Sequence, residues 1–186
     1  MNFRPLVDGI LLLWFIIEFV RRIYARQSTD YSADRRLSGT IFILLLICFL
    51  VSSIVHSAGI GNWTAPIWGN WLGVALLVSG VIFRQYAITV LGRFFSPVIQ
   101  IQQDHQLVKS GPYRFLRHPT YTGMLLAFYG AGLALGNWII FVAFVILPTL
   151  AILRRIKVEE EMLEAHFGKE YQDYRSGTKK LIPFVF

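Results

Sequence analysis

Five long apolar runs, separated by short polar or charged segments, constrain the fold of this chain more than any other feature. They cover residues 6–22, 38–56, 68–90, 121–135 and 138–153. A membrane-spanning helix needs about 20 mostly apolar residues. The first three runs are long enough, and the last two, each about one turn short, predict a tight helical hairpin around Gly136 and Asn137. Only 16% of the residues are charged, against about 25% in soluble domains. The predicted fold class is therefore all-α, a polytopic integral membrane helical bundle of about five transmembrane helices.

The positive charges orient these helices in the membrane. Of the 18 Lys and Arg residues, all but Arg4 lie in residues 21–36, in or just before residues 91–120, or after residue 153. Cytoplasmic loops of membrane proteins carry an excess of Lys and Arg. We therefore expect both charged loops and the C-terminus in the cytoplasm and the N-terminus outside, in a prokaryotic inner membrane or the endoplasmic reticulum. The net charge of +7 does not indicate a nucleic acid partner, because the basic residues interrupt apolar runs instead of forming one basic surface.

The chain divides into two expected regions. Residues 1–90 hold three N-terminal transmembrane helices, and residues 91–186 hold a cytoplasmic loop, the hairpin, a C-terminal cytoplasmic helix and the candidate catalytic residues. The apolar periodicity after the last run predicts that its helix continues into the tail with one apolar face. This face comprises Ile156, Leu163, Phe167, Tyr171 and Tyr174. Pro148 is expected to kink the same helix.

Two residues inside the apolar runs need an explanation. Glu18 is a functional candidate because carboxylates are costly at membrane depth, but it lies four residues before Arg22, and we favour a snorkelling ion pair between the two. Cys48 is the single cysteine and is interpreted as a small apolar core residue. The sequence has no P-loop, CxxC or HExxH pattern, so no metal site is predicted.

Two polar segments concentrate the residues that could carry chemistry. Residues 105–123 hold two His, three cations and two Tyr directly before an apolar run. Pro119 suits the first turn of the helix that follows, whose free N–H groups would favour an anionic group such as a ligand carboxylate. Further along, Arg155 and Glu159 are four residues apart and therefore share one helix face. The structural alternatives are an amphipathic interfacial loop and a solvated charged face.

Together the two segments resemble the isoprenylcysteine carboxyl methyltransferase family, which has phospholipid N-methyltransferase relatives. The likeness covers residues 105–183, roughly the C-terminal half. It depends on an ordered set of motifs: Arg117-His118-Pro119-Thr120-Tyr121-Thr122-Gly123, then Arg155 with Glu159-Glu160, then Phe167-Gly168-Lys169-Glu170-Tyr171-Gln172-Asp173-Tyr174. The first three apolar runs show no matching motif.

This resemblance implies an integral membrane enzyme that uses S-adenosyl-L-methionine. By motif position, the cofactor pocket would be lined by His105, Gln106, Leu107, Val108, Tyr113, His118, Pro119, Thr120, Tyr121 and Glu159. Arg155 would hold the substrate carboxylate, so that Arg155 and Glu159 are the candidate catalytic residues. The family also uses a Gln shortly before the first His, and Gln100, Gln102 and Gln103 all qualify.

Three chemistries remain open from the sequence. The favoured one is methyl ester formation on the carboxylate of a lipidic, isoprenylcysteine-like small molecule or lipidated peptide. A carboxylate is already deprotonated at neutral pH, so this reaction requires positioning and exclusion of water but no general base. N-methylation of a phospholipid amine would require a base, for which Glu160 or His118 are candidates. A sterol-type reductase using NADPH has a similar Arg-His-Pro-x-Tyr-x-Gly stretch, but the Glu-Glu pair and Phe-Gly favour methyl transfer. Membrane lipids are expected partners, and the sequence does not fix an oligomeric state.

Overall fold

The computed structural model describes residues 3–27, 40–63, 66–96 and 106–182. Its long helices are α1 (Arg4–Gln27), α3 (Thr40–Ser57), α4 (Ile67–Leu91), α5 (Pro119–Ala134) and α6 (Trp138–Phe167), followed by the short α7 (Lys169–Gly177). Two 3-10 turns, Gly92–Phe94 and Gly111–Arg114, lie between α4 and α5. The described residues contain no strand, only the isolated bridges Asn62↔Asn137 and Leu116↔Lys179. The all-α prediction is confirmed for this part of the chain.

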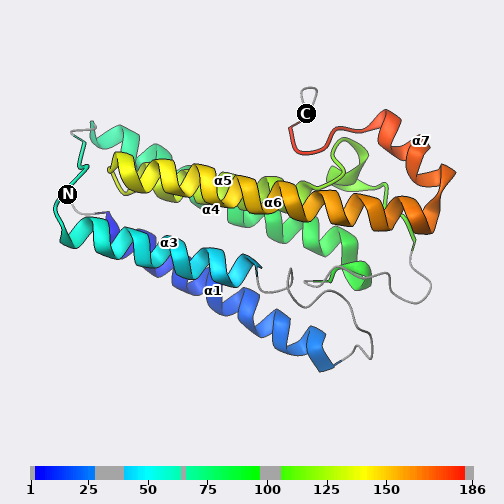
Figure 1. Ribbon diagram of the computed structural model, residues 1–186, viewed down its shortest axis with the longest axis horizontal. Helices are drawn as coiled ribbons and strands as arrows, with labels where there is room; N and C mark the ends of the chain where they lie inside the picture. Colours follow the sequence, from blue (N-terminus) through cyan, green and yellow to red (C-terminus); the bar gives the residue numbers. More distant parts are fainter. Residues whose placement is uncertain (1–2, 28–39, 64–65, 97–105, 183–186) are drawn as a thin grey trace.

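The five long helices run along the long axis of the molecule (Figure 1). The N-terminus and the α5–α6 turn lie at one end, and α7 lies at the other. The turn confirms the predicted hairpin: Gly136 adopts a φ of +63°, which favours glycine, and the Asn137 side chain accepts hydrogen bonds from Ile139 N (3.0 Å) and Ile140 N (3.2 Å) to cap α6. The hairpin returns α6 to the end where α5 begins.

Helix α5 occupies the centre of the bundle, since twelve of its sixteen residues are buried. Its most extensive contact is with α4. There Gly80 faces the backbone of Gly123 and Ala127, and Gly73 faces the backbone of Gly130. A Cβ atom added to any of these glycines would collide with the backbone of the opposite helix. These glycines let two helices approach as closely as small-residue interfaces in membranes do.

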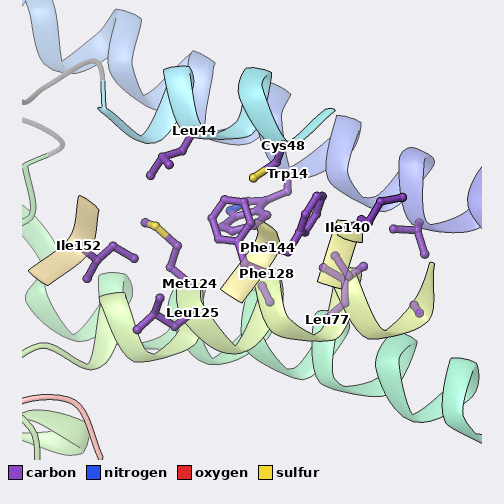
Figure 2. Close-up of a cluster of buried hydrophobic side chains, with 14 of the residues drawn as sticks. Trp14, Leu44, Cys48, Leu77, Met124, Leu125, Phe128, Ile140, Phe144 and Ile152 are labelled. Carbon is purple, nitrogen blue, oxygen red and sulfur yellow. The ribbon is translucent and has the colours of Figure 1, made fainter. Parts of the chain in front are cut away.

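All five long helices contribute to one hydrophobic core (Figure 2). Trp14 of α1 packs against Phe128 of α5 with ring centroids 5.5 Å apart, and Phe128 meets Phe144 of α6 at 6.1 Å. Cys48 of α3 is 1% exposed in this cluster, as its interpretation as an apolar core residue predicted. The core therefore joins the N-terminal helices to the hairpin.

The outer faces of the helices are also apolar. Leu12 of α1, Ile54 of α3 and Ile82 of α4 are each at least 60% exposed. Within the described residues, two helical segments are long and apolar enough to cross a membrane, Ile67–Phe94 and Trp138–Phe167. An 18-residue stretch of each has a mean hydropathy of 1.8 and 2.2, respectively. Soluble monomers rarely expose apolar patches of this extent, whereas lipid contact requires them. This exterior is that of an integral membrane protein.

Two sequence predictions about the helices are wrong. The helix after the last apolar run does not continue through Tyr174: α6 ends at Phe167, and Gly168, with φ +53°, redirects the chain into α7. Glu18 does not snorkel to the surface: it is 3% exposed and pairs with Arg84 of α4. The side chain of Arg22, its expected partner, lies outside the described part of the structure. Pro148 lies inside α6, and the helix runs through it.

Candidate active site

The Arg117–Tyr121 motif is held by the C-terminal segment of the chain. Its backbone pairs with that segment through Arg117 N to Lys179 O (2.8 Å) and His118 N to Lys180 O (3.2 Å). The Tyr174 hydroxyl of α7 donates to Tyr113 O at 2.7 Å. These bonds join residues about 60 positions apart, and they fix the loop that enters α5.

Glu160 of α6 anchors the same loop electrostatically. Its Oε1 accepts from Arg117 Nε at 2.9 Å and lies 3.3 Å from His118 Nε2, and its Oε2 is 3.6 Å from Lys180 Nζ. A buried carboxylate with three such neighbours is stabilised in its charged form. Glu160 does not line the cavity described below, so its position favours a structural role over that of a general base.

Arg155, Tyr121 and Glu159 form a hydrogen-bonded chain between α6 and the first turn of α5. Arg155 Nε donates to the Tyr121 hydroxyl at 2.7 Å, and this hydroxyl donates to Glu159 Oε2 at 2.7 Å. Arg155 is 3% exposed. The imidazole of His118 stacks near the Tyr121 ring, with centroids 5.7 Å apart. The phenol thereby fixes the orientation of both the guanidinium and the carboxylate.

An open cavity lies beside this chain, between the ends of α4, α5 and α6 and the loop before α5. Its enclosed space is about 100 Å³, and it opens to solvent through a mouth that brings the empty volume to about 940 Å³. The sequence-predicted residues that line it are Gln106, Leu107, Val108, Tyr113, His118, Thr120, Tyr121, Arg155 and Glu159. Pro119 is not among the lining residues: it is buried at the first position of α5. His105, Gln100, Gln102 and Gln103 lie outside the described residues.

Several lining residues were not predicted as site residues from the sequence. They are Arg84, Leu91, Phe94, Phe95, Ser96, Arg117, Met162, Leu163, Tyr171 and Tyr174. An arginine within an apolar run is a signal that identifies Arg84 as a functional candidate. Leu163, Tyr171 and Tyr174 were recognised as one apolar face, but no local pattern indicates that this face meets a cavity.

Two phenols in the cavity wall have buried hydroxyls with no hydrogen-bond partner among the described residues, those of Tyr113 and Tyr171. Burial raises the pKa of both phenols, with smaller contributions from the Glu159 and Glu160 carboxylates. Both therefore remain neutral and able to donate a hydrogen bond. Buried polar groups are normally paired, so these hydroxyls fit a wall that receives a polar ligand.

Helix α1 contacts the site through an ion pair between Glu18 and Arg84, a residue that lines the cavity. Glu18 accepts from Arg84 Nε at 2.8 Å and from Arg84 Nη2 at 3.1 Å. Arg84 Nη1 also donates to the backbone oxygen of Thr120 at 3.2 Å. In the described part of the chain, no cluster of three or more His, Cys, Asp or Glu could hold a metal ion.

Comparisons with known proteins agree on one family. A model of the isoprenylcysteine carboxyl methyltransferase (ICMT) family matches residues 72–165. Protein-S-isoprenylcysteine O-methyltransferase B of Arabidopsis thaliana is 32% identical over 188 residues, covering 99% of this chain and 95% of that protein. The Saccharomyces cerevisiae protein-S-isoprenylcysteine O-methyltransferase is 34% identical over 116 residues, covering 61% of this chain and 48% of that protein.

A solved structure shares the fold. It is that of the eukaryotic intramembrane Ras methyltransferase ICMT, with a TM-score of 0.72 and 23% sequence identity. The match covers 96% of this chain and 65% of that chain. The helical arrangement described above therefore has a counterpart in a membrane methyltransferase.

Proposed function

The chain belongs to the isoprenylcysteine carboxyl methyltransferase family, and on this premise we propose that it methylates the carboxylate of an isoprenylated cysteine with S-adenosylmethionine as donor. The observation that carries this proposal is the Arg155–Tyr121–Glu159 chain at the wall of a cavity lined by the motif residues. The product is a methyl ester on a lipidic small molecule or a lipidated peptide.

The side chains that line the cavity fit the chemistry of the donor. The hydroxyls of Tyr113 and Tyr171 in the cavity wall supply two unpaired donors for a polar ligand. We assign donor binding to Gln106, Leu107, Val108, Tyr113, His118, Thr120, Tyr121 and Glu159. When bound, the donor supplies a methyl group on a sulfonium sulfur. Glu159 would favour its positive charges, because its carboxylate lies at the cavity wall.

We assign the acceptor carboxylate to Arg155. A guanidinium presents a planar fork that binds a carboxylate in a bidentate fashion, and Tyr121 holds Arg155 through Nε. The reaction exchanges an S–C bond for an O–C bond and moves no proton, so the residues need to orient the carboxylate and exclude water. The apolar side chains of Leu107, Val108 and Leu163 in the cavity wall help to exclude water.

Amine methylation is less well supported by this site. It requires a group that removes a proton. Of the two candidate bases, Glu160 binds Arg117 and does not line the cavity. His118 lines the cavity, but its Nε2 lies 3.3 Å from Glu160 Oε1 and is engaged there. The hydrogen-bonded Arg155 is instead suited to an anionic acceptor.

We further propose that α1, α3, α4, α5 and α6 all cross the membrane, with the cavity and C-terminus in the cytoplasm. Two observations support this topology. The exposed apolar faces of α1, α3, α4 and α6 surround a buried α5, and Lys and Arg are concentrated in the C-terminal halves of α1 and α6 and in α7, which lie at one end of the bundle (Figure 1). In this arrangement a polar donor enters from the cytoplasm and an isoprenyl chain enters from the bilayer. The expected division into residues 1–90 and 91–186 then separates mainly scaffold from mainly site, with Arg84 as the exception.

A methyl-transfer assay tests the reaction. Purified protein in detergent receives S-adenosylmethionine with a labelled methyl group and an S-farnesylated cysteine derivative, and base-labile, volatile label is counted. We expect label in wild type, a loss of at least 100-fold in kcat/KM in Arg155→Lys and Glu159→Gln, and wild-type rates in Arg154→Lys, whose side chain is exposed one position earlier. Base-stable label, or full activity in Arg155→Lys, would refute the proposal.

Cysteine labelling tests the topology. Replacing Cys48, the single cysteine, gives a cysteine-free background. Single cysteines at Ala58, after α3, and at Arg175, in α7, are then exposed to a membrane-impermeant maleimide in sealed vesicles. The proposed topology requires that they label from opposite sides, and labelling from the same side would contradict it.

A further inference from the structure

The ion pair between Glu18 and Arg84 is the most deeply buried charge pair described in the bundle. The two side chains are 3% and 2% exposed and meet through two hydrogen bonds, at 2.8 and 3.1 Å. The indole N–H of Trp14 donates to Glu18 Oε1 at 3.3 Å, and Arg21 Nη1 lies 3.9 Å from the same oxygen. The Glu18 carboxylate is therefore fixed from three sides.

Arg84 connects this carboxylate to the cavity. Its Nη1 donates to Thr120 O at 3.2 Å, and its side chain lines the cavity. Thr120 directly precedes Tyr121, the phenol that orients Arg155 and Glu159. One guanidinium thus holds the α1 carboxylate and the first turn of α5 at the same time.

Simple stabilisation is a weak explanation for such a pair. Burying two charges costs a desolvation free energy that their attraction often does not recover, and a hydrophobic pair would frequently be as stable. The pair also sets the electrostatics of the cavity wall, since an unpaired Arg84 would place a positive charge beside a site for a sulfonium cation. Glu18 neutralises that charge.

We propose that Glu18 is a positioning residue for methyl transfer, acting through Arg84 on the first turn of α5. This inference rests on the proposed function. It makes α1, which shows no family motif, a functional part of the site and not only a membrane anchor.

Steady-state kinetics of Glu18→Gln test the inference. We expect kcat to decrease by 10- to 100-fold, because small displacements of orienting groups have effects of about that size. The concentration of folded sites is counted by calorimetric titration with S-adenosylhomocysteine, so that loss of protein is not mistaken for loss of rate. Glu164→Gln is the matched control, because Glu164 forms an exposed pair with Arg175 at 3.4 Å, and it should keep the wild-type turnover. Turnover per folded site within twofold of wild type in Glu18→Gln would overturn the inference.

A charge exchange separates positioning from a merely structural ion pair. The double variant Glu18→Arg, Arg84→Glu restores opposite charges, but the glutamate side chain at position 84 has no N–H group to donate to Thr120 O. We expect the unfolding temperature to recover towards wild type while kcat stays at least tenfold reduced. Recovery of kcat together with the unfolding temperature would show that the pair is only structural.

A milder change covers the case in which Glu18→Gln does not fold. Trp14→Phe keeps an aromatic ring in the core and removes one hydrogen bond to Glu18. We expect a two- to fivefold decrease in turnover per folded site, and an unchanged turnover would overturn the inference. Wild-type protein that neither binds S-adenosylhomocysteine nor forms methyl ester would refute the proposed function instead, so the two failures are distinguishable.

Discussion

Replacing Tyr121 with Phe removes one hydroxyl and leaves the ring in place. The hydroxyl lies 2.7 Å from Arg155 Nε and 2.7 Å from Glu159 Oε2, so the variant loses two hydrogen bonds to charged partners at once. A hydrogen bond to a charged group contributes about 1.5–3 kcal/mol. We take the transition state to lose the free energy of one such hydrogen bond when Arg155 and Glu159 are no longer oriented. Since about 1.4 kcal/mol corresponds to a factor of ten in rate, kcat/KM then falls by about 10- to 150-fold.

The matched control is Tyr129→Phe. Tyr129 lies on the same helix and its hydroxyl is 2.6 Å from Thr149 Oγ1, but it does not line the cavity. Both variants therefore remove a phenol hydroxyl from a hydrogen bond between α5 and α6, and only one of them touches the site.

The assay is base-labile methyl incorporation into an S-farnesylated cysteine derivative, measured at several concentrations of donor and acceptor and normalised to folded sites. We expect Tyr129→Phe to match wild type. Tyr121→Phe with more than half of the wild-type kcat/KM would refute the argument that the phenol orients Arg155 and Glu159. Equal losses in both variants would show that the effect comes from helix packing.

Three further predictions address packing, the anchor and pH. Gly80→Ala should lower the unfolding temperature by several degrees, because the added Cβ would meet the backbone of Ala127. Gly9→Ala is the control and should leave the unfolding temperature unchanged, because a Cβ at Gly9 has open space. Equal unfolding temperatures in the two variants would contradict the close-packing argument. Glu160→Gln should cost about 3 kcal/mol of stability in chemical unfolding and weaken S-adenosylhomocysteine binding, since it removes the carboxylate that pairs with the largely buried Arg117 guanidinium. A stability equal to wild type would refute its role as anchor. Between about pH 6.5 and pH 8.5 the rate should change less than about threefold, because an acceptor carboxylate with an ordinary pKa of about 3.5 is ionised throughout this range. The Tyr113 phenol does not ionise there either, because burial raises its pKa. A tenfold rise in rate per pH unit would indicate an amine acceptor.

The sequence alone determined the class of fold, the family and nine of the nineteen residues that line the cavity. Apolar runs of membrane length, the hairpin at Gly136 and Asn137 and the concentration of Lys and Arg are local features, each read within one segment. The resemblance to the family also depends on local features, because the Arg117–Gly123 motif and the Arg155–Glu159 pair are short sequence patterns with fixed spacing. Eight of the ten residues expected at the cofactor pocket line the cavity, Pro119 begins α5 and His105 lies outside the described residues.

Only the tertiary structure decided how these segments act on one another. Glu18 pairs with Arg84, 66 positions away, a partner that no spacing within α1 indicates, because the crossing of α1 and α4 buries both side chains. The same holds for Glu160, which faces the loop before α5 although its neighbour Glu159 faces the cavity. Pairing between distant helices depends on how their side chains interlock, which no periodicity within a single helix encodes.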